Sequence, residues 1–467
     1  MGNASTLPKT APVDATPQPA LTGSRQATAI FAVLSAMALV VLDAGIANNA
    51  LPSLGGALQA PASDVILVVT GYQAGLLMAL LPSGALGERF GHRRVFTSGV
   101  MVFAVASGLC AASPTLPWLV AARLLQGFGG GAIMALGVAL LRASVPAGRF
   151  GSAVGWNALV VALASATAPS LGAGILALAS WRAIFIATAP LSAIALLAAV
   201  ALPMGLRTAA RVDIPSVGLC AVAFGVLILA AEIATHDLHL AVSLLVVGLL
   251  TSWSLVRRER SKANPLLPLD LLGAKAFRVS VMASVLCFAG QAMGLLALPF
   301  LLQREAGHSP LEAGLAITVW PLSVAVTAVV AGRLSDRVST AWLCAYGGLC
   351  LSIGLAGAAT WPSTVPLAWL LASLATSGVG FGLFQTPNNR NLFLAAPAHR
   401  SGAAGGMQGV ARVTGQTFGS AAAGLLFSLS IAGSAPRTAL VIASALTLSA
   451  GLISLRRVPA NEGRGAS

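Results

Sequence analysis

Two charged side chains lie inside long apolar segments of this sequence. Asp43 follows a mostly apolar run from Ala27 to Leu42, and Arg123 lies several residues into another apolar run, one helical turn before Gln126. A charge within a bilayer is energetically costly, so such residues are rare and usually functional. A carboxyl group removed from water can exchange protons near neutral pH. We therefore predict that Asp43 and Arg123 take part in proton coupling, with Arg123 modulating the proton affinity of a nearby carboxylate.

Both residues also have a structural interpretation. Asp43 would then lie near the outer interface, hydrogen-bonded to Asn48 and Asn49 or paired with an arginine. Arg123 would extend its aliphatic stem along the helix and reach an interface with its guanidinium group. These alternatives stay open at the level of sequence.

Two short loops repeat one pattern of glycine, leucine, acid and arginine. The first runs over 84–94 (GALGERFGHRR) and the second over 332–338 (GRLSDRV). Paired opposite charges at helix ends are able to hold one conformation of a gate, whereas a role limited to setting topology is the alternative. The predicted gating residues are Gly84, Glu88, Arg89, Gly91, Arg93, Asp336 and Arg337.

Other polar and aromatic side chains within the apolar segments are candidates to line a substrate cavity. They are Asn48, Tyr72, Gln73, Gln126, Trp156, Asn157, Gln291, Trp320, Gln385, Arg412 and Gln416. As a set they predict a largely apolar cavity with a few polar groups, suited to a flat ligand. For any single aromatic, lipid contact or core packing is the alternative.

The composition shows which elements must position these residues. Hydrophobic residues make up 57% of the 467 and charged residues only 9%, against about 25% charged in a typical soluble domain. The mean hydropathy is +0.87. The net charge of +14 does not indicate a nucleic-acid partner, because the basic residues cluster in short loops between apolar runs, as in membrane proteins. The five cysteines are scattered without metal-site spacing, so we predict neither a metal nor a cofactor.

The apolar runs predict an all-α membrane protein with fourteen transmembrane helices, since about 20 apolar residues cross a bilayer. Lys and Arg then fall almost entirely on the side of the N-terminus, which predicts cytoplasmic termini in the cell inner (plasma) membrane. The predicted spans are 26–52, 63–87, 95–113, 117–142, 151–178, 182–204, 214–234, 239–256, 278–302, 309–333, 341–360, 365–387, 404–431 and 436–455.

The repeated loop divides the chain into two halves, because each copy follows the second span of six. Parallel repeats of six helices are a known transporter design, with the substrate at the interface between the halves. We predict a disordered cytoplasmic tail at 1–25, six-helix bundles at 26–204 and 263–455, an inserted two-helix hairpin at 205–262, and a second cytoplasmic tail at 456–467.

Several of these strings resemble one protein family. The loop at 84–94 resembles the signature loop of the major facilitator superfamily. The strings at 42–52 (LDAGIANNALP), 123–131 (RLLQGFGGG) and 264–272 (NPLLPLDLL) resemble motifs of its fourteen-helix drug:proton antiporters. The string at 168–174 (APSLGAG) resembles the fifth-helix antiporter motif, with Pro169, Gly172 and Gly174 at the matching positions.

This resemblance implies a transporter, not an enzyme, that exports amphiphilic drugs or small toxic compounds in exchange for protons and works as a monomer. Two departures are Glu88 in place of the usual aspartate and Ala168 in place of the glycine before the proline. The second departure keeps proton-coupled uptake or exchange of a small metabolite as an alternative. A membrane-embedded transferase is a more distant one, since it would require acids and histidines clustered at one membrane face. His236 and His239 have a spacing that can bind metal, but a solvated loop is the simpler interpretation.

Overall fold

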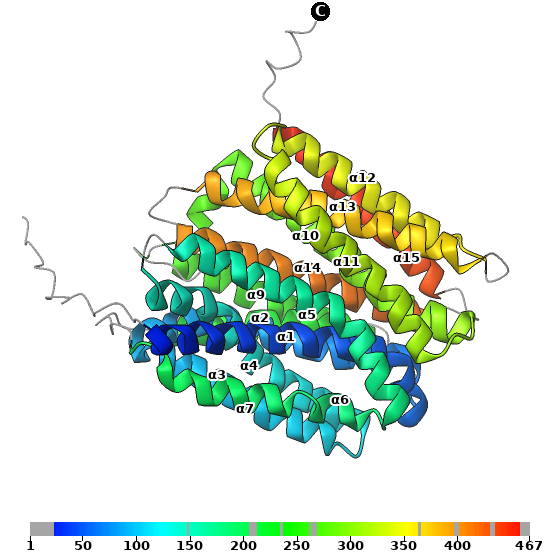
Figure 1. The fold of residues 1–467 in the computed structure, drawn as a ribbon, viewed down its shortest axis with the longest axis horizontal. Coiled ribbons are helices and arrows are strands. Elements are labelled where there is room, and N and C mark those ends of the chain that lie inside the picture. The colour runs from blue at the N-terminus through cyan, green and yellow to red at the C-terminus, as the bar shows by residue number, and fades with distance from the viewer. Residues whose placement is uncertain are drawn as a thin grey trace, which may run out of the picture.

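The computed structural model describes residues 23–146, 149–204, 213–233, 237–260, 262, 269–362, 366–396, 401–429 and 435–457. Every regular element within these ranges is a helix (Figure 1). Most of the two predicted tails, the metal-spaced His236 and most of the string at 264–272 fall outside the described residues. The all-α fold predicted from the sequence is therefore confirmed for the described part of the chain.

The helices follow the apolar runs of the sequence. A first helix group contains α1 (Gly23–Ala57), α2 (Ala62–Phe90), α3 (His92–Ala111), α4 (Leu116–Ser144), α5 (Phe150–Leu178), α6 (Arg182–Ile186) and α7 (Ala189–Ala198). A hairpin follows, formed by α8 (Ile214–Ile233) and α9 (Leu238–Glu259). A second helix group contains α10 (Lys275–Phe300), α11 (Pro310–Leu334), α12 (Thr340–Ala359), α13 (Leu367–Leu394), α14 (Ser401–Leu429) and α15 (Ala435–Ser454).

The sixth predicted segment differs from a continuous helix. It is broken between Ile186 and Ala189 into α6 and α7. Pro190 lies in the first turn of α7, where it lacks an N–H group and its ring conflicts with the carbonyl of Ile186, four residues earlier. The proline was visible in the sequence, but the strong hydropathy of the segment masked its effect.

Twelve helical segments in the described ranges are long and apolar enough to cross a membrane. Helix α8 is found only as a shorter apolar helix, and α14 is not in this set. The reason for α14 is its content of Gln408, Arg412 and Gln416, which lower its hydropathy. The protein is thus a multi-pass membrane protein with about twelve clear spans, where the sequence had predicted fourteen.

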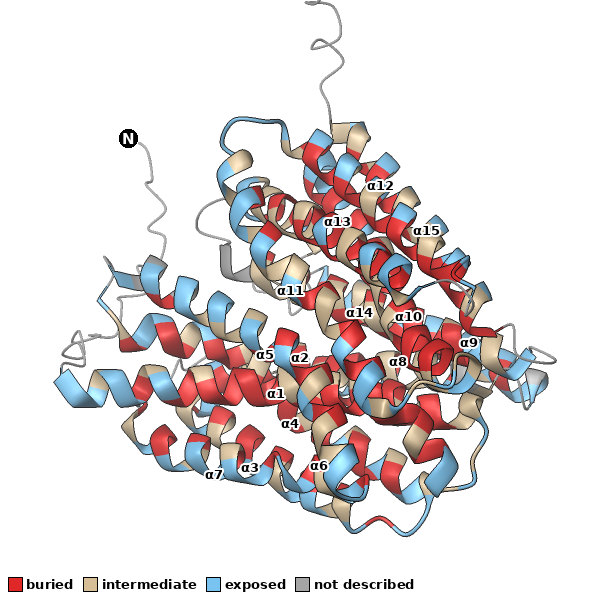
Figure 2. Cartoon of the chain, turned by 45° about the vertical axis from the view of Figure 1, so that its right-hand side comes forward, coloured by how far each residue is buried: buried red, intermediate tan, exposed pale blue. Residues whose placement is uncertain are grey.

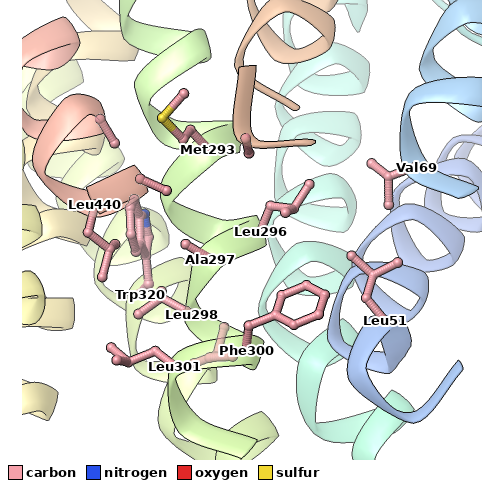
Figure 3. Packing of buried hydrophobic residues seen from close by; sticks show 14 of the residues in the cluster. Leu51, Val69, Met293, Leu296, Ala297, Leu298, Phe300, Leu301, Trp320 and Leu440 are labelled. Carbon is pink, nitrogen blue, oxygen red and sulfur yellow. The ribbon is translucent and has the colours of Figure 1, made fainter. Parts of the chain in front are cut away.

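The two helix groups pack side by side, as Figure 2 shows. Helix α5 of the first group packs on α11 of the second, α2 packs on α14, and α1 contacts α10. Figure 3 shows this contact in detail: Phe300 and Leu296 project from α10 on the side where Leu51 and Val69 lie. One hydrophobic core therefore continues from the first group into the second.

Polar contacts between the groups gather at one end of the molecule. The Gln303 side chain donates to the carbonyl of Asn49 at 3.2 Å, and the hydroxyls of Ser170 and Thr318 are 2.5 Å apart. Away from this end, α5 and α11 expose large apolar side chains. These exposed side chains are Trp156, Leu159 and Leu163 on α5, and Leu322, Val326, Val329 and Val330 on α11.

We call the contact between the two groups, formed by α5 with α11, α2 with α14 and α1 with α10, the seam. The hairpin packs against both α2 and α14 and so covers one side of this seam. Its ends are joined by an ionic cluster in which Arg258 donates to Asp213 at 2.8 and 2.9 Å and Lys262 donates to both Asp213 and Glu259. The hydrogen bonds from Arg258 and Lys262 hold the pKa of Asp213 well below its usual range. A depressed carboxyl pKa keeps the cluster intact as pH falls, until the pH approaches that lowered value.

Helices α2 and α4 approach so closely that a side chain has no room at Gly127. A Cβ atom there would collide with the backbone of α2 at Tyr72. We expect Gly127→Ala to destabilise the protein by about 1–3 kcal/mol, because an extra carbon in a packed interior forces the backbone apart. Thermal unfolding in detergent tests this. Gly108→Ala is the matched control, since nothing lies within 4 Å of its Cβ position; equal stability of both variants would contradict the prediction.

Candidate functional site

Asp43 and Arg123 form a buried ion pair at the centre of the first helix group. Arg123 Nη1 lies 2.5 Å from Asp43 Oδ2, and both side chains are almost fully enclosed. Gln126 completes the network, because its Nε2 donates to Asp43 Oδ1 at 2.9 Å and its Oε1 accepts from Arg123 Nη1 at 2.5 Å. Each oxygen of the carboxylate therefore has a donor of its own.

Helix geometry explains why α4 supplies both partners. Residues three apart on a helix lie on the same face, so Arg123 and Gln126 point together towards α1. The arginine is held further by α2, where its Nε donates to the carbonyl of Val68 at 3.1 Å and its guanidinium lies 4.2 Å from the centre of the Tyr72 ring. From α3, the hydroxyl of Ser107 accepts from Gln126 at 2.8 Å.

This network is a poor source of stability. Two charges that leave water lose about as much solvation energy as their attraction returns, and an apolar replacement of similar volume is often as stable. The network instead holds the carboxylate of Asp43 between two donors of α4, so that any change at Asp43 changes the partners of Arg123 and Gln126.

The antiporter-type motif of α5 lies where three helices meet. The carbonyl of Pro169 accepts from Asn49 Nδ2 on α1 at 3.2 Å, and Gly172 packs against Ile46. On the other side, Gly314 of α11 packs closely against Pro169 and Ala173. Gly174 has nothing within 4 Å of its Cβ position, so packing does not require glycine there. The motif thus forms part of the contact between the two groups.

The first copy of the repeated loop exposes its charged pair. Glu88 and Arg89 face outward, and the Arg89 guanidinium lies 5.1 Å from the centre of the Phe90 ring. Within the described ranges Glu88 forms no ion pair. Gly91 adopts a φ of +98°, which favours glycine, and Arg93 donates to the carbonyl of Leu202 at 3.4 Å.

The second copy of the loop makes a different contact. Asp336 pairs with Arg390 of α13 at 2.9 Å, and Arg390 also donates to the carbonyl of Ser335. Arg337 is exposed, and Gly84, in the first copy, has open space at its Cβ position. The two copies share a sequence pattern but differ in their partners in this conformation.

Most of the predicted cavity residues share an unusual property: they have an enclosed polar atom without a hydrogen-bond partner. Buried polar atoms nearly always have one, so these atoms mark places where a ligand or water can bind. The atoms are Asn48 Oδ1, Gln73 Oε1, Asn157 Oδ1, Gln291 Oε1, Trp320 Nε1 and Arg412 Nε, together with Asn49 Oδ1, Thr414 Oγ1 and Ser420 Oγ, which were not predicted.

These atoms have a common location in the fold. They belong to α1, α2, α5, α10, α11 and α14, the six helices through which the two groups contact each other; two further unpartnered atoms, Glu305 Oε1 and Arg457 Nε, lie outside these helices. Gln385 and Gln416 are half-buried on α13 and α14. Six of the eleven predicted cavity residues thus have an unpartnered polar atom and belong to helices that join the two groups, whereas Gln385 belongs to α13.

Two aromatic candidates are placed elsewhere. The Trp320 ring lies beside Gly294 and Leu355 within the second helix group, and Figure 3 shows it on the side of Leu440, away from Leu51. Trp156 on α5 is 58% exposed, and its place in a cavity stays a prediction. Tyr72 and Gln126 belong to the Arg123 network instead of an open cavity. Hydropathy gives no signal for the direction of an aromatic side chain on an apolar helix.

One member of the network was missed by sequence reasoning. Ser107 is one of two serines in α3, and its hydroxyl donates to the carbonyl of Phe103 in its own helix, so nothing in its spacing singled it out as a partner of another helix. Among the described residues no group of three potential metal ligands occurs.

Comparison with known proteins gives a consistent result. A family model described as Major Facilitator Superfamily matches residues 33–420 and 279–466. The chain is 39% identical over 405 residues to the uncharacterized transporter YebQ of Escherichia coli strain K12, covering 86% of this chain and 89% of that one. It is 30% identical over 368 residues to the riboflavin transporter RibZ of Clostridioides difficile, with coverages of 78% and 80%.

A multidrug efflux pump, LfrA of Mycolicibacterium smegmatis, is 28% identical over 431 residues and covers 89% of this chain and 84% of its own. Among solved structures, the xylose transporter XylE of E. coli in a partially occluded inward open conformation matches with a TM-score of 0.65 at 17% identity, over 93% of this chain and all of that one. The peptide transporter POT with sulfate matches at 0.70 and 16% identity, over 92% and 94%. These structures share the fold.

Proposed function

Because this chain belongs to the Major Facilitator Superfamily, we propose that it is a proton-coupled secondary transporter that exports amphiphilic drugs or small toxic compounds by alternating access. The protein is a membrane transporter and not an enzyme, as its relatives are transporters. The coupling ion, the direction of transport and the substrate are parts of the proposal.

The observation that carries the proposal is the buried contact of Asp43 with Arg123 and Gln126. A proton arriving from outside neutralises Asp43 and releases Arg123 from its partner. The altered charge then favours a different packing of the two halves, because protonation changes the relative free energy of the two states. A potential of 100 mV supplies about 2.3 kcal/mol per proton, which sustains a substrate gradient of roughly fifty-fold.

Alternating access requires two halves that move against each other. We propose that residues 26–204 and 263–455 are these halves, that residues 205–262 are an inserted pair, and that the repeated loops act as cytoplasmic gates. Helices α8 and α14 would complete fourteen spans, since α8 packs on α2 and α14 along α10. The polar contacts near Asn49 and Ser170 support a state closed on the outer side.

We place the protein in the inner (plasma) membrane as a monomer with both termini in the cytoplasm. The positive-inside distribution of Lys and Arg supports this orientation. The likeness to the multidrug efflux pump LfrA supports export.

Uptake or exchange of a small metabolite is the second candidate function. It is favoured by Ala168, which stands where the antiporter motif usually has glycine and whose methyl group packs against Gly45. The likeness to a riboflavin transporter also agrees with it.

Transport into proteoliposomes of the purified protein tests the proposal. An amphiphilic fluorescent dye is added outside vesicles that have an acidic lumen. Exchange of dye for protons predicts that the dye accumulates inside, and this accumulation should collapse when an ionophore removes the proton gradient. An inverted gradient, acidic outside, should give none. Accumulation only with the acidic exterior would show that dye and proton move together and would refute export by exchange; accumulation independent of the gradient would refute proton coupling.

A further inference from the structure

Arg412 is a cation without a counter-charge. It lies at the twelfth position of the 29-residue helix α14, roughly 16 Å from the start at 1.5 Å per residue, and therefore deep in the membrane. Its Nε is enclosed without a partner, and no acidic side chain in the described ranges pairs with it.

The charges at the seam therefore do not balance. Away from their ends, the six seam helices carry only two charged residues, Asp43 and Arg412. The charge of Asp43 is matched by Arg123 from α4. One positive charge remains, on Arg412, in a region of low dielectric constant where an uncompensated charge is costly.

The surroundings of Arg412 fit an amphiphilic ligand. Val410 and Val413, its neighbours on α14, are buried in one cluster with Leu76 and Leu80 of α2. The Thr414 hydroxyl, two residues further, has no partner. Arg412 is intermediate in burial as a residue, and its enclosed Nε is a donor left for a ligand. A cation, a few polar atoms and apolar walls together define the chemistry of the site.

We propose that the transported compound carries a negative charge, as a carboxylate, sulfonate or phosphate on an apolar body, and that Arg412 binds this group. The proposal rests on the transport function proposed above and specifies its substrate class. A guanidinium binds such oxyanions through two parallel hydrogen bonds, which are stronger than neutral ones. Export of an anion is also favoured by a membrane potential that is negative inside.

Two xanthene dyes of similar shape provide a direct test. Fluorescein is an anion near neutral pH, and rhodamine 123 is a cation. Binding of each to the purified full-length protein in detergent is measured by fluorescence anisotropy without any gradient. We expect a Kd for fluorescein about tenfold or more below that for rhodamine 123, in line with one charge-assisted hydrogen-bonded contact.

Variants of Arg412 separate charge from shape. Arg412→Gln should raise the Kd for fluorescein by about tenfold or more while leaving rhodamine 123 binding nearly unchanged, and Arg412→Lys should retain most of the preference. Arg257→Gln on the exposed face of the hairpin removes the same charge elsewhere and should have no effect. Thermal unfolding checks that each variant is folded.

Several results would overturn the proposal: no fluorescein binding, equal binding or a preference for rhodamine 123 in the wild type, or an unchanged preference in folded Arg412→Gln. The wild-type comparison decides the matter even if Arg412→Gln does not fold. Proton-driven export of rhodamine 123 would also contradict it, although the proposed transport function would survive. Preferred binding of fluorescein without any proton-driven transport would support the anionic ligand and refute the proposed transport function.

Discussion

Replacing Asp43 with asparagine is expected to eliminate proton-driven transport while leaving exchange of substrate across the membrane intact. Asparagine has nearly the same shape, and its side-chain oxygen still accepts a hydrogen bond from Arg123 or Gln126. It cannot take up a proton, so the two states of the transporter no longer differ in protonation. The expected accumulation falls from about fifty-fold at 100 mV to none.

Reconstituted vesicles allow both readouts in one preparation. Gradient-driven uptake is measured with an imposed proton gradient, and exchange is measured as counterflow of labelled against unlabelled substrate. Asp64→Asn is the matched control, because Asp64 lies in the first turn of α2 and its carboxylate accepts from the neighbouring Ser63 hydroxyl. If Asp43→Asn still accumulated substrate against its gradient, another group would have to carry the proton.

The positions of the helices could be predicted from the sequence, because hydropathy and segment length are properties of the chain alone. Asp43 and Arg123 were recognisable for a related reason: a charge in an apolar run is conspicuous wherever the helix packs. Their direct contact, 80 positions apart in sequence, depends on how α1 and α4 rotate against each other. Hydropathy contains no information on that rotation.

The same limit explains what sequence reasoning missed. Ser107 became a partner of Gln126 only through the packing of α3 on α4. Trp320 was expected in a cavity but packs inside the second helix group, since an apolar ring is equally consistent with either place. The predicted amides remain a prediction: an amide on an apolar helix is costly unless it has a polar partner, and Asn48, Gln73 and Gln291 each have an oxygen without one.

A second large effect is expected on stability. Arg123→Gln leaves the carboxylate of Asp43 buried without its cation, and breaking a buried pair from one side costs about 3–5 kcal/mol. Asp43→Asn combined with Arg123→Gln removes both charges and leaves neutral amides that can bond to each other. We therefore expect the double variant to unfold at a higher temperature than Arg123→Gln alone, which thermal unfolding in detergent measures.

This order of stabilities distinguishes charge from packing. If Arg123→Gln were destabilising because it loses contacts with Tyr72 and Val68, removing Asp43 as well would bring no recovery, and the two variants would unfold together. If the unpaired charge is responsible, the double variant should unfold at the higher temperature, because asparagine at position 43 leaves no buried charge to stabilise.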